Sequence, residues 1–243
     1  RFKNHYISQT AISIVSATEW QYRLGLTSLL FKEKAMDKIL LSVDPMVFNY
    51  VPKDAAKKKY GIPENKKVIF FGSAFLNERR KGMKYLIDAL KKMREHTEIN
   101  KENILLLIAG NDFELIKSEI PFEYRYLGLL ANNEELAEAF QASDIYVCPS
   151  IEDSGPMMIN QAIMCGIPSV TYNMGVAMDL VINGSTGYRA KLMDTDDLAL
   201  GITNLLKLDQ VTYETYSKNC RELALSSFTP DVQIEKFEKL FMQ

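Results

Sequence analysis

The segment GSAFLNERRKG, residues 72–82, gathers residue types that bind phosphate. It follows an expected strand and ends in Arg79, Arg80 and Lys81 just before an expected helix. Guanidinium and ammonium groups beside exposed helix amides suit a diphosphate, because each charge-assisted hydrogen bond contributes about 1.5–3 kcal/mol. Taken alone, the segment is better explained as a surface loop of solvated charges. Taken together with a second segment, it is better explained as a phosphate-binding loop.

The second segment is SIEDSGPMMINQ, residues 150–161, which connects an apolar strand to a helix. Pro156 fits the first helical position, where the missing N–H would have no partner anyway. The amides of Met157 and Met158, beside Gly155, would then present the positive end of the helix dipole to an anion. That dipole contributes about 0.3–1 kcal/mol, and up to roughly 2 kcal/mol when partly buried. The alternative is a capped core helix in which both methionines are packing residues.

Other residues near these segments could bind the rest of a nucleotide sugar. Asp153 would repel phosphate if it pointed the same way, but it could accept hydrogen bonds from sugar hydroxyls. Gln161, inside the helix, could hydrogen-bond a ribose diol. Gly128 and Leu130 could offer backbone groups and an apolar wall to a nucleobase, although a plain loop fits equally well. Gly175 would permit close backbone approach, but a turn glycine is the simpler explanation.

Several other chemistries lack their motifs in this chain. No G-x-G-x-x-G, G-x-x-x-x-G-K-[ST] or G-x-S-x-G pattern follows a strand, which disfavours an NAD enzyme, a P-loop NTPase and an α/β-hydrolase. Asp194, Asp196 and Asp197 precede a helix, where we expect a cap and first-turn acids instead of a metal site. His5 and His96 stand alone in polar segments and are expected on the surface. We therefore expect neither a metal nor a cofactor.

The amino-acid composition further narrows the classes of protein to which the chain can belong. The chain has 243 residues, 47% of them hydrophobic, with 29 basic and 31 acidic side chains and a net charge of −2, so nothing draws it globally to nucleic acid or membrane. The lysines of residues 53–60 are expected on a solvated helix face. Cys148, Cys165 and Cys220 have no metal-ligand spacing and are expected as buried free thiols in a reducing compartment. No signal peptide or membrane-spanning apolar run is visible, and the first residues suggest an excised fragment.

The elements that must position the two segments alternate regularly from Lys67 onward. Apolar runs predict strands at Val68–Ser73, Ile104–Asn111, Phe122–Gly128, Asp144–Ser150, Pro168–Asn173 and Gly187–Leu192. Amphipathic stretches between them predict helices. Before this region we expect a buried strand at Ala11–Val15, a helix capped by Thr18 and a strand at Lys38–Val43. The alternation predicts an α/β fold with a Rossmann-like, doubly wound parallel sheet, whose ligands bind outside the carboxyl ends of the strands.

The order of these motifs resembles a known family. G…RKG, LLLIAG, YLG, EEL, ASDIYVCPSIED, QAIMCGIPSV and NGSTGY, between Lys67 and Leu206, resemble the C-terminal domain of family 4 glycosyltransferases, which are retaining enzymes of the GT-B fold. ISIVSATEWQYRLGLTSLLF resembles the last strand and helix of their N-terminal domain. The resemblance implies that residues 1–48 end an N-terminal domain and form a linker, that 49–228 form a nucleotide-sugar-binding domain, and that a helix at 229–243 packs back.

The resemblance also implies an activity. The enzyme would transfer a hexosyl group, with retention, from a UDP- or GDP-sugar to a hydroxyl of a glycan or lipid-linked acceptor, without a metal and without nucleic acid. It implies a cytoplasmic protein that contacts the membrane face, if at all, through the absent part of the N-terminal domain. We expect the isolated fragment to be inactive.

Carried across residue by residue, the resemblance assigns roles. Arg80 and Lys81 would hold the diphosphate and Asp153 would bind the transferred sugar, which makes these three the catalytic candidates. The amides of Gly155, Met157 and Met158 would help with the diphosphate, and Gln161 would bind the ribose. The remaining donor-binding candidates are Gly72, Ser73 and Leu130.

The chain departs from the family pattern at informative positions. Gln161 replaces the second acid of the usual pair, Ser73 stands where many members have arginine, and Val176 replaces a second glycine. These departures keep open a non-catalytic or degenerate nucleotide-sugar-binding module. A sugar-nucleotide epimerase would need acid and base residues that the chain does not display.

Overall fold

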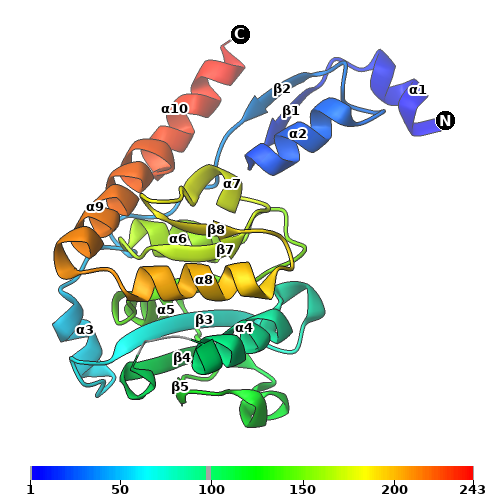
Figure 1. The fold of residues 1–243 in the computed structure, drawn as a ribbon. Coiled ribbons are helices and arrows are strands. Elements are labelled where there is room, and N and C mark those ends of the chain that lie inside the picture. The colour runs from blue at the N-terminus through cyan, green and yellow to red at the C-terminus, as the bar shows by residue number, and fades with distance from the viewer. Residues whose placement is uncertain (1, 97–99, 243) are drawn as a thin grey trace.

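The computed structural model describes residues 2–96 and 100–242 and has a large α/β lobe with a small N-terminal lobe above it (Figure 1). In the described chain the large lobe holds a six-stranded sheet, parallel throughout, in the order β5-β4-β3-β6-β7-β8. Its strands are β3 (Lys67–Phe75), β4 (Ile104–Asn111), β5 (Glu123–Tyr126), β6 (Ile145–Cys148), β7 (Ser169–Tyr172) and β8 (Gly187–Ala190). The predicted doubly wound α/β fold is confirmed.

The strand order creates a crevice at the middle of the sheet. The chain starts at β3, moves outward through β4 to β5, and then returns to lay β6 on the other side of β3. Connections from β3 and β6 therefore leave in opposite directions, and their loops diverge at the carboxyl edge. Such a switch point is where open parallel sheets bind ligands.

Helices cover both faces of the sheet (Figure 1). One face carries α4 (Met83–His96) and α8 (Thr195–Leu206), and the other carries α5 (Asn133–Gln141), α6 (Met157–Met164) and α9 (Gln210–Ser227). The predicted apolar stripe of α4 is confirmed, since its five members are all buried. Burial of each such side chain contributes about 1.5–3 kcal/mol. The stripe consists of Met83, Leu86, Ile87, Leu90 and Met93.

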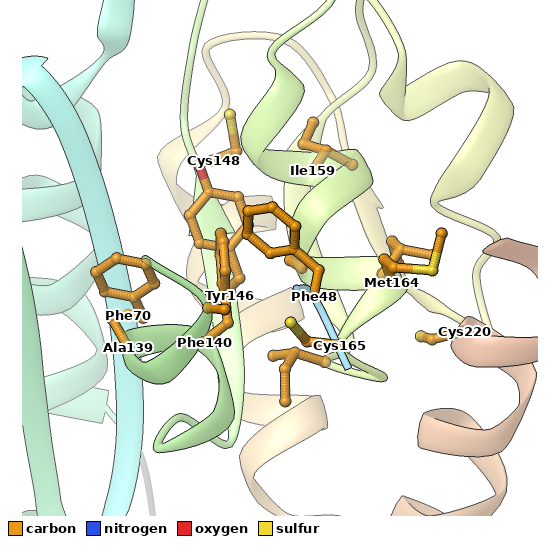
Figure 2. Packing of buried hydrophobic residues seen from close by; sticks show 14 of the residues in the cluster. Phe48, Phe70, Ala139, Phe140, Tyr146, Cys148, Ile159, Met164, Cys165 and Cys220 are labelled. Carbon is orange, nitrogen blue, oxygen red and sulfur yellow. The ribbon is translucent and has the colours of Figure 1, made fainter. Parts of the chain in front are cut away.

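Aromatic rings fill the core between the sheet and α5 (Figure 2). The ring of Phe140 meets Phe70 edge-on at 5.1 Å and Tyr146 at 5.2 Å between centroids, a geometry that aromatic quadrupoles favour. The cysteines Cys148, Cys165 and Cys220 are buried and unpaired, as predicted. Burial raises the pKa of the Cys165 thiol to about 12, which makes it a packing group and a poor nucleophile.

The small N-terminal lobe differs from its prediction in strand placement. It contains α1 (Phe2–Gln9), β1 (Ser13–Ser16), α2 (Glu19–Thr27) and β2 (Ala35–Lys38), with β1 parallel to β2. Thr18 caps α2 as predicted, because its hydroxyl accepts a hydrogen bond from the amide of Gln21 at 3.1 Å. The predicted buried strand at Ala11–Val15 is wrong in its burial, since Val15 is 37% exposed. In the described chain β1 has β2 as its sole partner strand, which leaves one edge open.

The strand predicted at Lys38–Val43 is also wrong, since β2 ends at Lys38. The backbone groups of the segment after β2 form hydrogen bonds with a side chain and with a distant carbonyl group instead of with a neighbouring strand. Asn160 donates to the carbonyl of Leu41 at 3.1 Å, and the amide of Val43 donates to the carbonyl of Phe228 at 3.0 Å. Such partners satisfy the backbone without a sheet ladder.

The lysine-rich helix α3 (Lys53–Lys59) is not fully solvated, which corrects its prediction. The ammonium groups of Lys53 and Lys57 lie 3.0 and 3.1 Å from the carboxylate of Asp144, at the start of β6. Asp144 also accepts a hydrogen bond from the amide of Val68 at 2.7 Å. The helix therefore buries two of its charges against the amino end of the sheet.

The last helix, α10 (Pro230–Phe241), reaches back to the segment after β2. The side chain of Gln233 donates to the carbonyl of Leu40 and accepts from the hydroxyl of Ser42, each at 2.9 Å. The division of the chain into domains at 1–48, 49–228 and 229–243 stays a prediction.

The remaining short helices are α7 (Ala177–Leu180), η1 (Arg79–Lys81), η2 (Lys101–Asn103), η3 (Phe113–Leu115) and η4 (Lys117–Glu119). None of the helices in the described ranges is both long and apolar enough to cross a bilayer.

Candidate functional site

Two loops meet at the switch point of the sheet, and backbone contacts lock them together. The basic loop (residues 72–82) comprises the last four residues of β3 and the segment that follows it, and the elbow loop (residues 149–156) follows β6. The amide of Ile151 donates to the carbonyl of Arg80 at 2.9 Å. Gly82 has a left-handed φ of 77°, and a Cβ there would lie 1.8 Å from the carbonyl oxygen of Pro149. Glycine at position 82 therefore permits the close approach of the two loops.

The structure brings the charged candidates together at this junction. The Nζ atom of Lys81 lies 2.6 Å from Oδ2 of Asp153, and Nη1 of Arg80 lies 3.7 Å from the same oxygen. Arg80 also forms an ion pair with Glu78. The second oxygen of Asp153 accepts a hydrogen bond from the amide of Gly155 at 3.2 Å. Residues predicted from two separate loops thus converge around one carboxylate.

This arrangement changes the predicted role of the Gly155 amide. In the described structure that amide donates to Asp153, and Lys81 uses one of its three N–H donors on the same carboxylate. The side chain of Asp153 is 13% exposed and that of Lys81 is 24% exposed, so water screens the pair less than a surface pair. An incoming anion would have to share Lys81 with Asp153 or displace it.

A cleft of about 570 Å³ lies beside the charged junction. Gly72 and Ser73 line one wall and Met157 and Met158 line the other. A Cβ on Gly72 would lie 2.8 Å from the terminal methyl group of Met158, so the glycine lets this side chain lie against β3. The complete lining is Phe71, Gly72, Ser73, Ala74, Phe75, Glu78, Arg80, Lys81, Tyr146, Cys148, Ser150, Pro156, Met157 and Met158.

Helix α6 starts one residue later than predicted. Pro156 is the N-cap, with φ −64° and ψ 105°, and Met157 is the first helical residue. Met157 and Met158 are half-buried and also pack against the core, so they are packing residues and cleft residues at once. The amino end of α6 nevertheless opens toward the cleft, as predicted.

Four candidates are not part of the cleft lining that the described chain forms: Asp153 and Gly155, which belong to the charged junction, and Leu130 and Gln161. Leu130 is half-buried and packs against the core on the α6 side of the sheet. Gln161 lies one helical turn beyond Met157, also half-buried, and neither residue is part of the lining within the described chain. The hydroxyl of Ser73 donates to the carbonyl of Phe75 at 3.1 Å. The roles proposed for Leu130 and Gln161 stay predictions.

Reasoning from the sequence missed some residues of the cleft and its surroundings. Tyr146 and Cys148 point from β6 into the cleft floor, and their alternation along a strand was the available signal. Glu78 pairs with Arg80 from two residues away. From the small lobe, the hydroxyl of Thr18 donates to the carbonyl of Ser154 at 3.1 Å. No local pattern points to that long-range contact.

The acidic segment before α8 is a helix cap, as expected. A carboxylate oxygen of Asp194 accepts from the amides of Asp196 and Asp197 at 3.1 and 3.0 Å. Across residues 2–96 and 100–242, no group of three or more His, Cys, Asp or Glu side chains is placed to hold a metal ion. The isolated His5 is exposed, and the side chain of His96 lies outside the described residues.

A doubly wound sheet with a basic loop and an elbow loop at its switch point defines an α/β ligand-binding domain. The chain belongs to the glycosyl transferases of group 1, whose pattern matches residues 52–223. This match confirms the expected glycosyltransferase assignment, whereas membership of family 4 stays a prediction.

Similar proteins extend this assignment. The chain is 25% identical over 217 residues to N-acetyl-alpha-D-glucosaminyl L-malate synthase of Bacillus anthracis, across 88% of this chain and 55% of that protein. It thus spans about half the length of this curated relative. Its structure resembles sucrose-phosphate synthase of Thermosynechococcus elongatus, with TM-score 0.81, 20% identity, and coverage of 97% of this chain and 59% of that one. It also resembles Anabaena Alr3699/HepE in complex with UDP and glucose, with TM-score 0.76, 18% identity, and coverage of 99% and 65%. These likenesses confirm the fold as one half of the GT-B architecture.

Proposed function

We propose that this chain is the donor-binding half of a retaining glycosyltransferase. The enzyme transfers a hexosyl group from a UDP- or GDP-sugar to a hydroxyl of a glycan or lipid-linked acceptor. The observation that carries the proposal is the convergence of Arg80 and Lys81 on the elbow loop at the switch point. Because the chain spans 55% of its relative, the other half of the site would come from a further domain.

Arg80 and Lys81 would act on the leaving group. A departing nucleoside diphosphate gains negative charge, and fixed cations beside it stabilise the transition state more than the ground state. The proposal includes no metal for this task. The diphosphate would take over Lys81 from Asp153, whose carboxylate would then be free to accept hydrogen bonds from hydroxyls of the transferred sugar.

The donor is the best-supported part of the substrate. The HepE structure is described with UDP and glucose, and it shares the fold of this chain. Retention, the hexosyl group, the acceptor, the cytoplasmic location and any contact with a membrane face rest on the resemblance of the motifs. They are parts of the proposal.

The test measures nucleoside diphosphate release by the full-length protein with UDP- and GDP-sugars. Arg80→Ala should reduce the rate about 10²- to 10³-fold, as loss of one preorganised charge-stabilising group does. Arg79→Ala is the matched control, because Arg79 is exposed and adjacent but lies outside the cleft lining. Equal rates for the two variants would refute the role of Arg80. The anomeric configuration of the product, read by NMR, tests retention.

A second candidate function is a non-catalytic nucleotide-sugar-binding module. The specific observation in its favour is Gln161, which stands where the motif resemblance leads us to expect an acid. A neutral amide can bond a ribose diol but lacks the charge-assisted part of that bond. Donor binding without any release of nucleoside diphosphate would support this module.

A further inference from the structure

The small N-terminal lobe touches the elbow loop through one hydroxyl group. Thr18 is 1% exposed, and its Oγ1 donates to the carbonyl of Ser154 at 3.1 Å while accepting from the amide of Gln21. A Cβ on Gly155 would lie 3.2 Å from the methyl group of Thr18. Thr18, the N-cap residue of α2, therefore packs directly on the elbow loop, which contains Asp153.

Asp179 holds the same end of α2 against the large lobe. Its Oδ2 accepts from the amide of Glu19 at 2.9 Å, and its Oδ1 accepts from the ammonium of Lys38 at 2.7 Å. The side chain of Asp179 is 5% exposed, so this carboxylate is nearly dehydrated and fully partnered. A carboxylate at a helix amino end is favoured by the helix dipole.

The turn before Asp179 closes the other side of the elbow loop. Gly175 has a φ of 53°, and a Cβ there would lie 2.7 Å from the carbonyl oxygen of Asp153. The backbone from Asp153 to Gly155 thus contacts both the start of α2 and the turn that leads into α7. Because these contacts are close, a movement of α2 relative to α7 would displace that backbone.

We propose that Thr18 and Asp179 are positioning residues for the donor site. Asp179 anchors the amino end of α2 on α7, and Thr18 on that end fixes the carbonyl of Ser154. Together they hold the elbow loop so that Asp153 stays in contact with Lys81, which lines the cleft. The functional part of this inference rests on the proposed function, because it assumes that the elbow loop binds the donor.

Four variants separate positioning from general stability. Thr18→Val keeps the shape but removes both the donor to Ser154 and the acceptor for the Gln21 amide, whereas Thr18→Ser keeps the hydroxyl and both hydrogen bonds. Asp179→Asn keeps an acceptor oxygen but removes the charge that binds Lys38. Arg23→Ala is the control on the same helix, since Arg23 is 67% exposed and pairs only with Glu19 among the ion pairs described.

Three measurements are made on each variant. Hydrogen exchange of the peptide covering residues 151–158 reports the elbow loop itself, without any ligand. Calorimetric titration with UDP reports donor binding, and thermal unfolding checks that each variant is folded. Thr18→Val and Asp179→Asn should accelerate exchange and weaken UDP binding by about 2- to 10-fold, as expected for one lost hydrogen bond. Thr18→Ser and Arg23→Ala should match the unmodified protein.

The outcomes distinguish this inference from the proposed function. Unchanged exchange in Thr18→Val and Asp179→Asn overturns the positioning role, whatever UDP does. Faster exchange with unchanged UDP affinity shows that the contacts hold the loop but overturns their role in donor binding. If the unmodified protein binds neither UDP nor GDP, the proposed function fails and with it the donor-binding role, while exchange still decides whether the contacts hold the loop.

Discussion

The ammonium nitrogen of Lys81 lies 2.6 Å from Oδ2 of Asp153, although the two residues come from loops after different strands. Sheet topology explains the contact, because β3 and β6 are neighbours whose connections diverge at this edge. Under the proposed function, Asp153 and a phosphate group of the donor would compete for Lys81.

Variants of this pair should therefore move UDP affinity in opposite directions. Lys81→Met removes a charge-assisted hydrogen bond of about 1.5–3 kcal/mol, so the Kd for UDP should rise about 10- to 150-fold. Asp153→Asn removes the competing carboxylate, so UDP should bind several-fold more tightly while sugar transfer falls. Titration calorimetry measures both. Glu152→Gln is the control, because Glu152 is an exposed acid next to Asp153. Weaker UDP binding by Asp153→Asn would contradict the competition.

Gly82→Ala should destabilise the protein more than Gly128→Ala. Both glycines have a left-handed φ, 77° and 71°, so alanine costs about 1–2 kcal/mol of backbone strain at either position. A Cβ at position 82 would also overlap the carbonyl oxygen of Pro149, whereas at position 128 nothing lies within 4 Å. Urea unfolding measures the difference, which should exceed about 1 kcal/mol. Equal losses of unfolding free energy in the two variants would mean that the basic loop and the elbow loop can move apart without a cost in stability.

Asp144→Asn should cost about 3–5 kcal/mol of unfolding free energy near pH 7, because it leaves Lys53 and Lys57 without their buried counter-charge. Burial opposes ionisation of Asp144, but the two ammonium groups and the amide of Val68 outweigh it and hold its pKa below the usual value.

The sign of the pH dependence follows from that direction. A carboxyl group whose pKa is lower in the folded state stabilises the fold above its ordinary pKa of about 3.9 and loses that contribution as the pH falls further. The difference between Asp144→Asn and the unmodified protein should therefore be full at pH 6 and shrink below about pH 4. Glu222→Gln, at an exposed pair with Lys218, should change stability by less than about 1 kcal/mol at any pH. A constant difference down to pH 3 would contradict a lowered pKa of Asp144 in the fold.

Gln161→Glu separates an active donor site from a vestigial one. In an active site the new carboxylate should bond the ribose diol with charge assistance and tighten UDP binding by about 3- to 10-fold. Gln161→Met keeps the volume and should weaken binding. Titration calorimetry with UDP and GDP measures both variants. If neither changes affinity, Gln161 does not contact the ribose.

The large lobe was predictable because its signals are local and redundant. In β4 and in the apolar stripe of α4, many residues carry the same secondary-structure signal. The parallel topology then places the two loops at one edge of the sheet. The small lobe was less predictable, since β1 and β2 are short and half-exposed and carry little periodicity. The burial of Lys53 depends on Asp144, a partner 91 positions away that no local pattern identifies.

The same reasoning applies to the site. Convergence of Arg80, Lys81 and Asp153 followed from the topology rule once the strands were placed. The hydrogen bond from Gly155 to Asp153 did not, because it depends on which way one carboxylate turns. The contact of Thr18 with Ser154 joins separate lobes and needs the full chain path.

The hydrogen bond from the Ile151 amide to the Arg80 carbonyl uses main-chain atoms alone. Side chains on η1 can thus be exchanged while the frame that carries them keeps its place. Within such a frame, a change of ligand preference needs new side chains and no new architecture, so a modest number of substitutions could redirect the domain to another ligand.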